Sequence, residues 1–324
     1  MTEQQAQRYD IIIVGGGPIG LACAIQAKQA GLSYLILEKG CLANSLYHYP
    51  LDMTFFSTAD RLEIGDIPFV TTRPKPKRRD ALEYYRKVAE HFQLHIRFFE
   101  RVETIDRQAE GFEIKTQKGM YSASHVIIAT GFYDIPKLME VPGETLPHVF
   151  HYYKDPHFFT GQRVLVVGAS NSSVDAALET YRKGAQVTMV VRKPAIGERV
   201  KYWVKPDIEN RIRNQEIQAF FSSEVKAIKP GSVDILTPEG PKSLEVDFVL
   251  ALTGYQPDFS FLQQIGITLS QDGIYRPSYD PRTMETNIKG LYLAGVVCGG
   301  LKTHEWFIEN SRIHAALIIK NIIK

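Results

Sequence analysis

Two turns of small residues are the features of this chain with the clearest chemistry. The first, at residues 15–20, reads Gly-Gly-Gly-Pro-Ile-Gly and follows the apolar strand pattern 9–14. The second, at residues 168–173, reads Gly-Ala-Ser-Asn-Ser-Ser and follows the apolar pattern 163–167. Each turn precedes a helical segment, and the N–H groups at the start of a helix bind a diphosphate. Two such turns in the same setting predict two dinucleotide sites, and therefore electron transfer between two dinucleotides.

Small residues in each turn let the backbone approach the phosphates and let the helix pack against the strand. In the first turn the predicted pyrophosphate ligands are Gly15, Gly17, Pro18 and Gly20. In the second turn they are Gly168, Ser170, Asn171 and Ser172. The serine hydroxyls of the second turn are expected to act as additional donors.

The strand that follows the first helix predicts which dinucleotide binds there. This segment, residues 33–38, ends in Glu38, 21 residues beyond Gly17. A carboxylate at this place accepts hydrogen bonds from the adenosine ribose and repels a 2′-phosphate. The first site, with Lys39 next to this carboxylate, is therefore predicted to bind FAD or NAD.

The strand that follows the second helix ends differently. Residues 186–193 finish with Arg192 and Lys193. These two cations could neutralise a 2′-phosphate, so the second site is predicted to bind NADP. The alternative is that both side chains form a solvated strand end.

Composition restricts the class of protein. With 324 residues, 44% of them hydrophobic and 23% charged, the chain has the size of about two globular domains. A net charge of +2 argues against a nucleic-acid scaffold. No apolar run approaches the roughly 20 residues of a membrane span, and residues 1–8 lack the apolar core of a signal peptide. The three cysteines are too widely spaced for a disulfide framework, so a cytoplasmic protein is expected.

The order of the predicted elements indicates an α/β fold with two Rossmann-like, three-layer domains. Residues 96–129 predict an antiparallel meander that ends in a buried strand, and a second β-α-β unit follows. Further strands are expected at 245–254 and 291–294, and a long final helix from about residue 303. We expect the second domain to be inserted into the first. The predicted FAD-binding domain is 1–133 and 257–324, and the predicted NADPH-binding domain is 134–256.

Several longer blocks of sequence are more specific than the turns. They are residues 44–50, 54–57, 62–66, 129–134 and 294–303. Together with the two turns and the predicted strand 291–294, these blocks make the chain resemble the two-dinucleotide-binding flavoproteins of the thioredoxin reductase type. It is most similar to the bacillithiol disulfide reductase family.

The resemblance implies an NADPH-oxidising FAD enzyme whose acceptor is a low-molecular-weight disulfide such as bacillithiol disulfide. The positions that match the family's FAD site are Asn44, Tyr49, Thr54, Val102, Ala129, Thr130, Gly131, Gly295 and Val296. The first three are expected near the isoalloxazine, and Val102 at the adenine. At Val296 the wider superfamily has an aspartate that binds the ribitol. Backbone N–H groups of residues 295–299 are expected to replace it here.

The cysteines depart from the chemistry of that family. The family usually has a cysteine immediately before the last glycine of the first turn, and this chain has Ile19 there. The C-x-x-C motif of thioredoxin reductases is also absent, and isoleucine cannot take part in thiol–disulfide exchange. Cys298, in a glycine-flanked segment, is the candidate for a redox thiol, with a spectator role as the alternative.

Other functions and partners stay open at this stage. One is electron transfer to a small redox protein, as in a ferredoxin–NADP reductase, which needs no cysteine. Another is a non-enzymatic flavin or NADP redox sensor. His91 and His95 have the i, i+4 spacing of zinc ligands, but no third ligand presents itself and no metal is expected. The sequence leaves the oligomeric state open, a homodimer or a higher homo-oligomer included.

Overall fold

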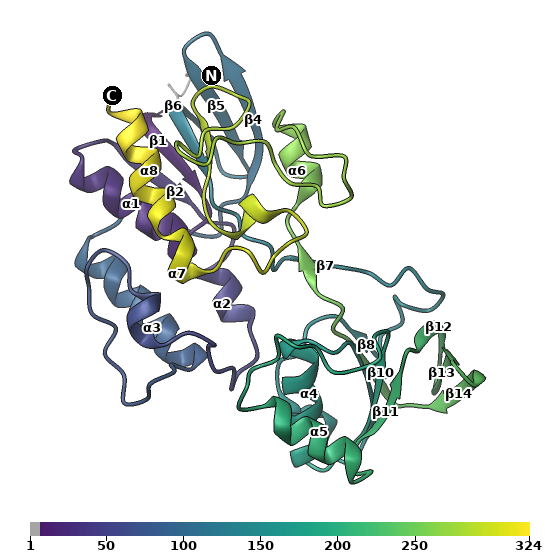
Figure 1. The fold of residues 1–324 in the computed structure, drawn as a ribbon. Coiled ribbons are helices and arrows are strands. Elements are labelled where there is room, and N and C mark those ends of the chain that lie inside the picture. Colours follow the sequence, from purple (N-terminus) through teal and green to yellow (C-terminus); the bar gives the residue numbers. More distant parts are fainter. Residues whose placement is uncertain (1–6) are drawn as a thin grey trace. The chain divides into compact units, whose positions relative to one another are not determined.

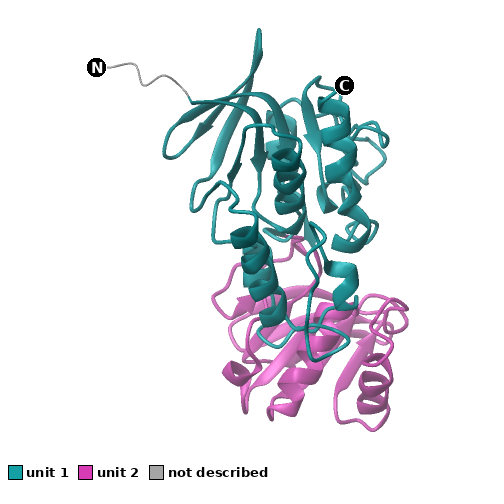
Figure 2. Cartoon of the chain, turned by 90° about the vertical axis from the view of Figure 1, so that its left-hand side faces the viewer, with its two compact units in different colours: residues 1–135, 255–324 teal, residues 136–254 magenta. Residues whose placement is uncertain are grey.

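The computed structural model describes residues 7–324, which divide into two compact units (Figure 1). Unit 1 runs to Ile135 and resumes at Tyr255, and unit 2 is Pro136–Gly254. Unit 2 is therefore an insertion in the sequence of unit 1. Figure 2 colours unit 1 teal and unit 2 magenta. The chain passes from one unit to the other twice, after Ile135 and after Gly254. At these two places β7 (Ile135–Pro136) and β16 (Tyr255–Gln256) pair in a small sheet. The predicted α/β fold class is confirmed.

The sheet of unit 1 runs in the order β3-β2-β1-β6-β5-β4, and β17 pairs with β6. Its strands are β1 (Gln7–Val14), β2 (Tyr34–Leu37), β3 (Ile96–Arg97), β4 (Val102–Gln108), β5 (Gly111–Thr116), β6 (Met120–Ile128) and β17 (Leu291–Leu293). β1, β2, β3, β6 and β17 are parallel, whereas β4, β5 and the first half of β6 form the predicted antiparallel meander. Ile11, Ile12 and Ile13 are fully buried. Such a continuous apolar run is typical of a parallel strand covered on both faces.

Helices surround this sheet. They are α1 (Pro18–Gln29), α2 (Asn44–His48), α3 (Arg78–His91), α6 (Phe259–Gln264), α7 (Ile308–Ser311) and α8 (Ile313–Ile322), with the 3₁₀ turns η1 (Ala59–Leu62) and η3 (Val296–Gly299). α1 and α8 pack side by side although they are far apart in sequence (Figure 1). The C-terminal helix is therefore part of the first nucleotide-binding unit.

The expected start of the final helix at residue 303 is wrong. The helix begins at Ile308 and is divided at Arg312 into α7 and α8. Asn310 explains the late start, because its side chain accepts a hydrogen bond from Phe307 N–H and donates one to the Glu305 carbonyl. These bonds hold the preceding residues in a turn.

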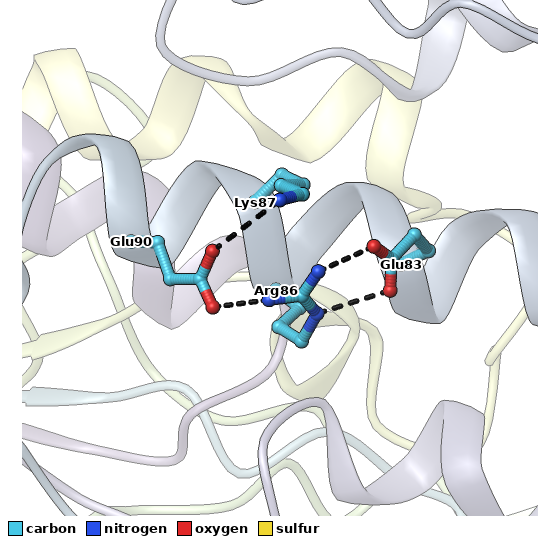
Figure 3. Close-up of polar contacts among 4 residues, drawn as sticks. All are labelled: Glu83, Arg86, Lys87 and Glu90. Carbon is cyan, nitrogen blue, oxygen red and sulfur yellow. Dashed lines mark hydrogen bonds and ion pairs between the residues drawn. The ribbon is translucent and has the colours of Figure 1, made fainter.

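α3 has two different faces. The buried face has the helical spacing i, i+3, i+4, i+7 and consists of Ala81, Tyr84, Tyr85 and Val88. On the solvent face Arg86 lies between Glu83 and Glu90 and pairs with both, and Lys87 is 3.8 Å from Glu90 (Figure 3). The Tyr85 hydroxyl donates to the Leu62 carbonyl at 2.9 Å. α3 thereby fixes the segment that precedes it.

Unit 2 has a five-stranded parallel sheet in the order β11-β10-β9-β15-β8 and a separate three-stranded antiparallel sheet. The strands are β8 (Val149–Phe150), β9 (Arg163–Val167), β10 (Gln186–Val191), β11 (Gln218–Phe221), β15 (Phe248–Ala251), β12 (Glu224–Lys229), β13 (Ser232–Thr237) and β14 (Gly240–Glu245). The helices are α4 (Asn171–Arg182) and α5 (Lys205–Arg213), with the 3₁₀ turn η2 (Pro156–Phe159).

Alternate residues of β9 face two different cores, as the strand period requires. Val164 and Val166 pack in the core that includes α4 and α5. Leu165 and Val167 pack in the core that includes β12 and β13. The parallel sheet is thus covered on both faces. Among residues 7–324, no helix combines the length and the apolar character that crossing a bilayer requires.

Candidate functional site

A cavity opens in unit 1 at the carboxyl ends of the parallel strands, where α/β folds bind their ligands. Its empty volume is about 1290 Å³, counting the part that is open to solvent. Predicted site residues on its wall are Gly15, Gly17, Pro18, Glu38, Lys39, Asn44, Tyr49, Val102, Ala129, Thr130, Gly131, Gly295 and Val296. Wall residues that sequence reasoning missed include Ala43, Ser45, Phe132, Tyr133, Asp134, Gln256, Asp258, Phe261 and Ile308.

The glycines of the first turn have distinct structural roles. Gly15 has φ +113°, and a Cβ there would lie 2.5 Å from the Ala129 carbonyl oxygen. A Cβ at Gly20 would lie 1.9 Å from the Gly15 carbonyl oxygen. Gly20 is therefore needed for close packing behind the turn and does not line the cavity. Gly17 differs, because a Cβ there would meet no atom within 4 Å.

The N-terminus of α1 is directed at this cavity. Gly17 is its N-cap residue, Pro18 is its first residue, and no side chain caps its N–H groups. The first turn of the helix also holds no acidic residue. An uncapped helix start has free N–H donors and the positive end of the helix dipole, and both favour an anion.

Glu38 is buried at the end of β2, with 5% of its surface exposed. Its two carboxylate oxygens accept hydrogen bonds from the N–H groups of Gly16, at 2.6 Å, and Gly40, at 2.8 Å. Burial raises the pKa of this carboxyl, and the two N–H groups oppose that shift. A carboxylate oxygen can accept more than one hydrogen bond, so Glu38 holds the turn in place and can still accept from a hydroxyl.

α2 brings its first residues to the cavity wall. It is preceded by Ala43, whose φ of +52° lies in the left-handed region and whose N–H donates to the Gly16 carbonyl. Arg78, buried at the start of α3, donates to the carbonyls of Leu46 and Tyr47 at the end of α2. A cation at a helix C-terminus stabilises the carbonyls that have no partner within the helix. Arg78 is thus a residue for this site that the sequence pattern did not reveal.

Aromatic and charged side chains form another part of the wall. The ring centroids of the wall residues Tyr49 and Tyr133 are 4.6 Å apart, edge to face. Tyr255, which is not a wall residue, contacts Tyr133 with a centroid distance of 4.3 Å. Burial raises the pKa of Tyr49 to about 12, so its hydroxyl keeps its proton near neutral pH. Lys39 Nζ is 2.6 Å from an Asp134 carboxylate oxygen. The predicted residue Thr54 is not on the wall; it pairs with Lys77 in an isolated β-bridge beside α3.

Unit 2 repeats the strand–turn–helix arrangement at Gly168. Gly168 has φ +125°, and a Cβ there would lie 2.7 Å from the Leu252 carbonyl oxygen. Ser170 is the N-cap residue of α4, and its own N–H donates to the Ser173 hydroxyl at 3.0 Å. The side chains of Ser170 and Ser172 are both exposed. These two hydroxyls and the start of α4 are accessible to a ligand.

Asn171, by contrast, has its side chain engaged with the segment 199–201. Its Oδ1 accepts from Lys201 N–H at 2.8 Å, and its Nδ2 donates to the Arg199 carbonyl at 3.3 Å. Lys201 is buried and pairs with Asp175 on α4 at 2.6 Å. Any contact of Asn171 with a ligand is therefore left to its backbone.

Arg192 and Lys193 directly follow β10 and are both exposed. β10 is parallel to β9, and Val190 is in register with Val167, the residue before the turn at Gly168. The two cations therefore lie at the same edge of the sheet as this turn.

The three cysteines are unpaired, and none of them lines the cavity of unit 1. Cys23 and Cys298 are fully buried, and burial raises the pKa of both thiols. Cys41 is partly exposed, and burial is also the main reason that its pKa is raised. All three are expected to remain protonated thiols near neutral pH.

Residues 12–295 match the pyridine nucleotide-disulphide oxidoreductase family. The chain belongs to this family. This oxidoreductase is 43% identical over 317 residues to bacilliredoxin reductase Bdr from Bacillus subtilis (strain 168), covering 97% of each chain. It is 28% identical over 297 residues to a ferredoxin–NADP reductase from Ignicoccus hospitalis, covering 88% of this chain and 89% of the relative. The structure of bacillithiol disulfide reductase Bdr from Bacillus cereus superimposes with a TM-score of 0.95 at 41% identity, covering 98% and 99% of the two chains.

The predicted resemblance to the bacillithiol disulfide reductase family is confirmed. The family and its Bdr relatives make the chain a reductase of the two-dinucleotide type and imply FAD and NADPH as its cofactors.

Proposed function

We propose that this oxidoreductase transfers electrons from NADPH through FAD to a low-molecular-weight disulfide, bacillithiol disulfide. The observation that carries the proposal is the identity of 43% with a Bdr relative over 97% of both chains. The reaction is assigned to the cytoplasm, because three unpaired cysteines suit a reducing compartment. We also propose that the enzyme acts as a homodimer or a higher homo-oligomer.

The residues of unit 1 fit FAD. The start of α1 has the N–H donors that a diphosphate needs, and the open space at Gly17 lets the phosphates approach the backbone. Glu38 would accept hydrogen bonds from the adenosine ribose hydroxyls, and Val102 would lie at the adenine. Tyr49, Asn44 and Ala43 would border the isoalloxazine side of the cavity. Thr54 would not contact the isoalloxazine itself. It would support this side of the cavity through its β-bridge with Lys77, the residue that precedes α3.

The residues of unit 2 fit NADPH. The turn at Gly168 and the hydroxyls of Ser170 and Ser172 would bind its pyrophosphate, and Arg192 and Lys193 its 2′-phosphate. When bound, NADPH supplies a hydride and FAD passes two electrons to the acceptor. The protein's own part is to hold both coenzymes by the starts of α1 and α4 and to keep bulk water from the buried wall.

Arg192→Ala should raise the KM for NADPH about 5- to 150-fold, because a charge-assisted contact to phosphate contributes about 1–3 kcal/mol. The KM for NADH should change much less, since NADH has no 2′-phosphate. Steady-state kinetics with both coenzymes measure this difference. Lys242→Ala, which removes an exposed cation bound to Glu239, is the control for net charge and should affect neither KM. An equal change for NADPH and NADH would contradict the assignment.

A second candidate function is favoured by the positions of the cysteines. No cysteine lines the cavity, so the cavity offers no thiol that could pass electrons from the flavin to a disulfide. Electron transfer to a ferredoxin needs no such thiol, and a ferredoxin–NADP reductase is among the relatives. A redox sensor without turnover is the third alternative.

Cys298→Ser should leave turnover within about twofold of wild type, because the wild-type thiol is buried and uncharged. The FAD content of the variant is measured alongside the rate, since the segment that contains Cys298 continues from the cavity wall. A collapse of the rate at full FAD content would instead assign a catalytic role to this thiol.

The test of the function is NADPH consumption by the purified FAD-loaded enzyme with separate acceptors. The acceptors are bacillithiol disulfide, a bacilliredoxin in mixed disulfide with bacillithiol, and a ferredoxin. We expect turnover with bacillithiol disulfide. Salt-sensitive reduction of the ferredoxin alone would favour the second function. Reduction of FAD by NADPH without turnover on any acceptor would favour the sensor.

A further inference from the structure

A buried histidine of α8 fixes the turn that forms one wall of the cavity. The Gly295 N–H donates to Nδ1 of His314 at 3.1 Å, and only 1% of the His314 surface is exposed. Because Nδ1 is the acceptor, the proton of the neutral ring is on Nε2. That Nε2 is buried and has no hydrogen-bond partner among residues 7–324.

The surroundings keep this imidazole neutral. The Trp306 ring lies 4.5 Å from the His314 ring, edge to face, and Cys298 Sγ is 4.0 Å from Nδ1. Both neighbours are uncharged, and burial lowers the pKa of His314 to about 4. The acceptor at Nδ1 is therefore present throughout the neutral pH range.

The turn that His314 holds also packs against the start of α1. Gly295 has φ +88°, in the left-handed region that favours glycine, and a Cβ there would lie 3.4 Å from Cβ and Cγ1 of Ile19. The Gly295 carbonyl accepts from Cys298 N–H at 3.2 Å. Both backbone polar groups of Gly295 are thus used within the protein, so the Gly295 N–H is not available to a ligand. Val296, the next residue on the cavity wall, is then the first of the segment that can offer its N–H.

We propose that His314 is a positioning residue of the FAD site. By accepting the Gly295 N–H, it fixes the peptide plane before Gly295 and so sets the direction in which Val296 faces the cofactor. This inference rests on the proposed function of unit 1. It explains how the segment binds the ribitol side without an acidic side chain at position 296.

The test compares two substitutions of His314, one that keeps a hydrogen-bond acceptor at the Nδ1 position and one that removes it. In His314→Asn the side-chain oxygen can take the place of Nδ1. In His314→Leu a side chain of similar size has no acceptor. FAD affinity is measured by titrating the flavin-free protein, and the visible spectrum of the bound flavin is recorded. We expect His314→Leu to weaken FAD binding at least tenfold and to shift the spectrum, and His314→Asn to bind within about threefold of wild type.

Ile318→Val is the matched control, because Ile318 is buried on the same helix and its substitution removes only packing. It should bind FAD as wild type does. If His314→Leu does not fold, His314→Gln takes its place, since the glutamine amide reaches the Nε2 position and leaves Nδ1 without a substitute. Wild-type FAD affinity in His314→Leu or His314→Gln would overturn the proposal. An equal loss of FAD affinity in His314→Asn and in the variant that lacks the Nδ1 acceptor would overturn it as well. A wild-type protein that binds no FAD would instead refute the proposed function itself.

Discussion

Gly17→Ala is expected to weaken FAD binding at least tenfold while leaving the fold intact. Gly17 has φ −78°, which alanine adopts readily, and its Cβ would meet no protein atom within 4 Å. Alanine at a compatible position even stabilises a protein by about 0.4–1 kcal/mol. The added methyl group would, however, occupy the space through which a diphosphate approaches the start of α1. Isothermal titration of flavin-free protein with FAD measures the loss, and tenfold corresponds to about 1.4 kcal/mol.

Gly20→Ala is the contrasting variant within the same turn. Its Cβ would lie 1.9 Å from the Gly15 carbonyl oxygen, so the turn cannot keep its shape. We expect this variant to lose both FAD binding and folding stability. Circular dichroism of the two variants distinguishes a folded protein that has lost only FAD binding from a protein that has lost its fold. Normal FAD affinity in a folded Gly17→Ala protein would refute the placement of the diphosphate.

The flavin-free enzyme is expected to lose about 3 kcal/mol of folding stability between pH 7 and pH 4 because of His314. Its pKa is about 4 in the folded state and 6.5 as the reference value, so the unfolded chain binds the proton first as the pH falls. One pKa unit corresponds to about 1.4 kcal/mol. The stability is therefore fully present above pH 6.5 and is lost as the pH falls toward 4. No charged group is among the causes of this shift; burial alone accounts for it.

Urea unfolding at pH 7, 5.5 and 4 measures this loss in wild type and in His314→Asn. The asparagine cannot be protonated, so the acid-dependent loss should be smaller in the variant by the amount that His314 contributes. The comparison with the variant is needed because other groups titrate in the same pH range. The raised pKa of Glu38, for example, makes the folded state bind a proton first, which increases the folding stability as the pH falls. Parallel pH profiles for the two proteins would show that His314 does not carry the effect.

Local chemistry explains which features were predictable from the sequence. Gly15 could be recognised because the tight turn requires a positive φ, and Gly20 because close packing behind the turn leaves no room for a Cβ. The spacing to Glu38 follows from the length of one helix and one strand. The meander and the parallel strands followed from their hydrophobic periods. Each of these signals lies within a few tens of residues along the chain.

The features that sequence reasoning missed depend on distant contacts. Arg78 acts on carbonyls 31 and 32 residues earlier, and His314 acts on a residue 19 positions earlier through packing of α8. Neither has a local pattern that distinguishes it from an ordinary helix residue. Asn171 was predicted as a ligand of the pyrophosphate, and only the fold reveals that its side chain is engaged by the segment 199–201.

The insertion of unit 2 has a consequence for biosynthesis. Unit 2 is continuous in sequence, so it can fold as soon as it has left the ribosome. Unit 1 must wait for β17 and α8, which complete its sheet and hold Gly295. A nascent chain therefore has a finished coenzyme domain before it can load its flavin, and truncation near the C-terminus would yield a protein that is half folded and colourless.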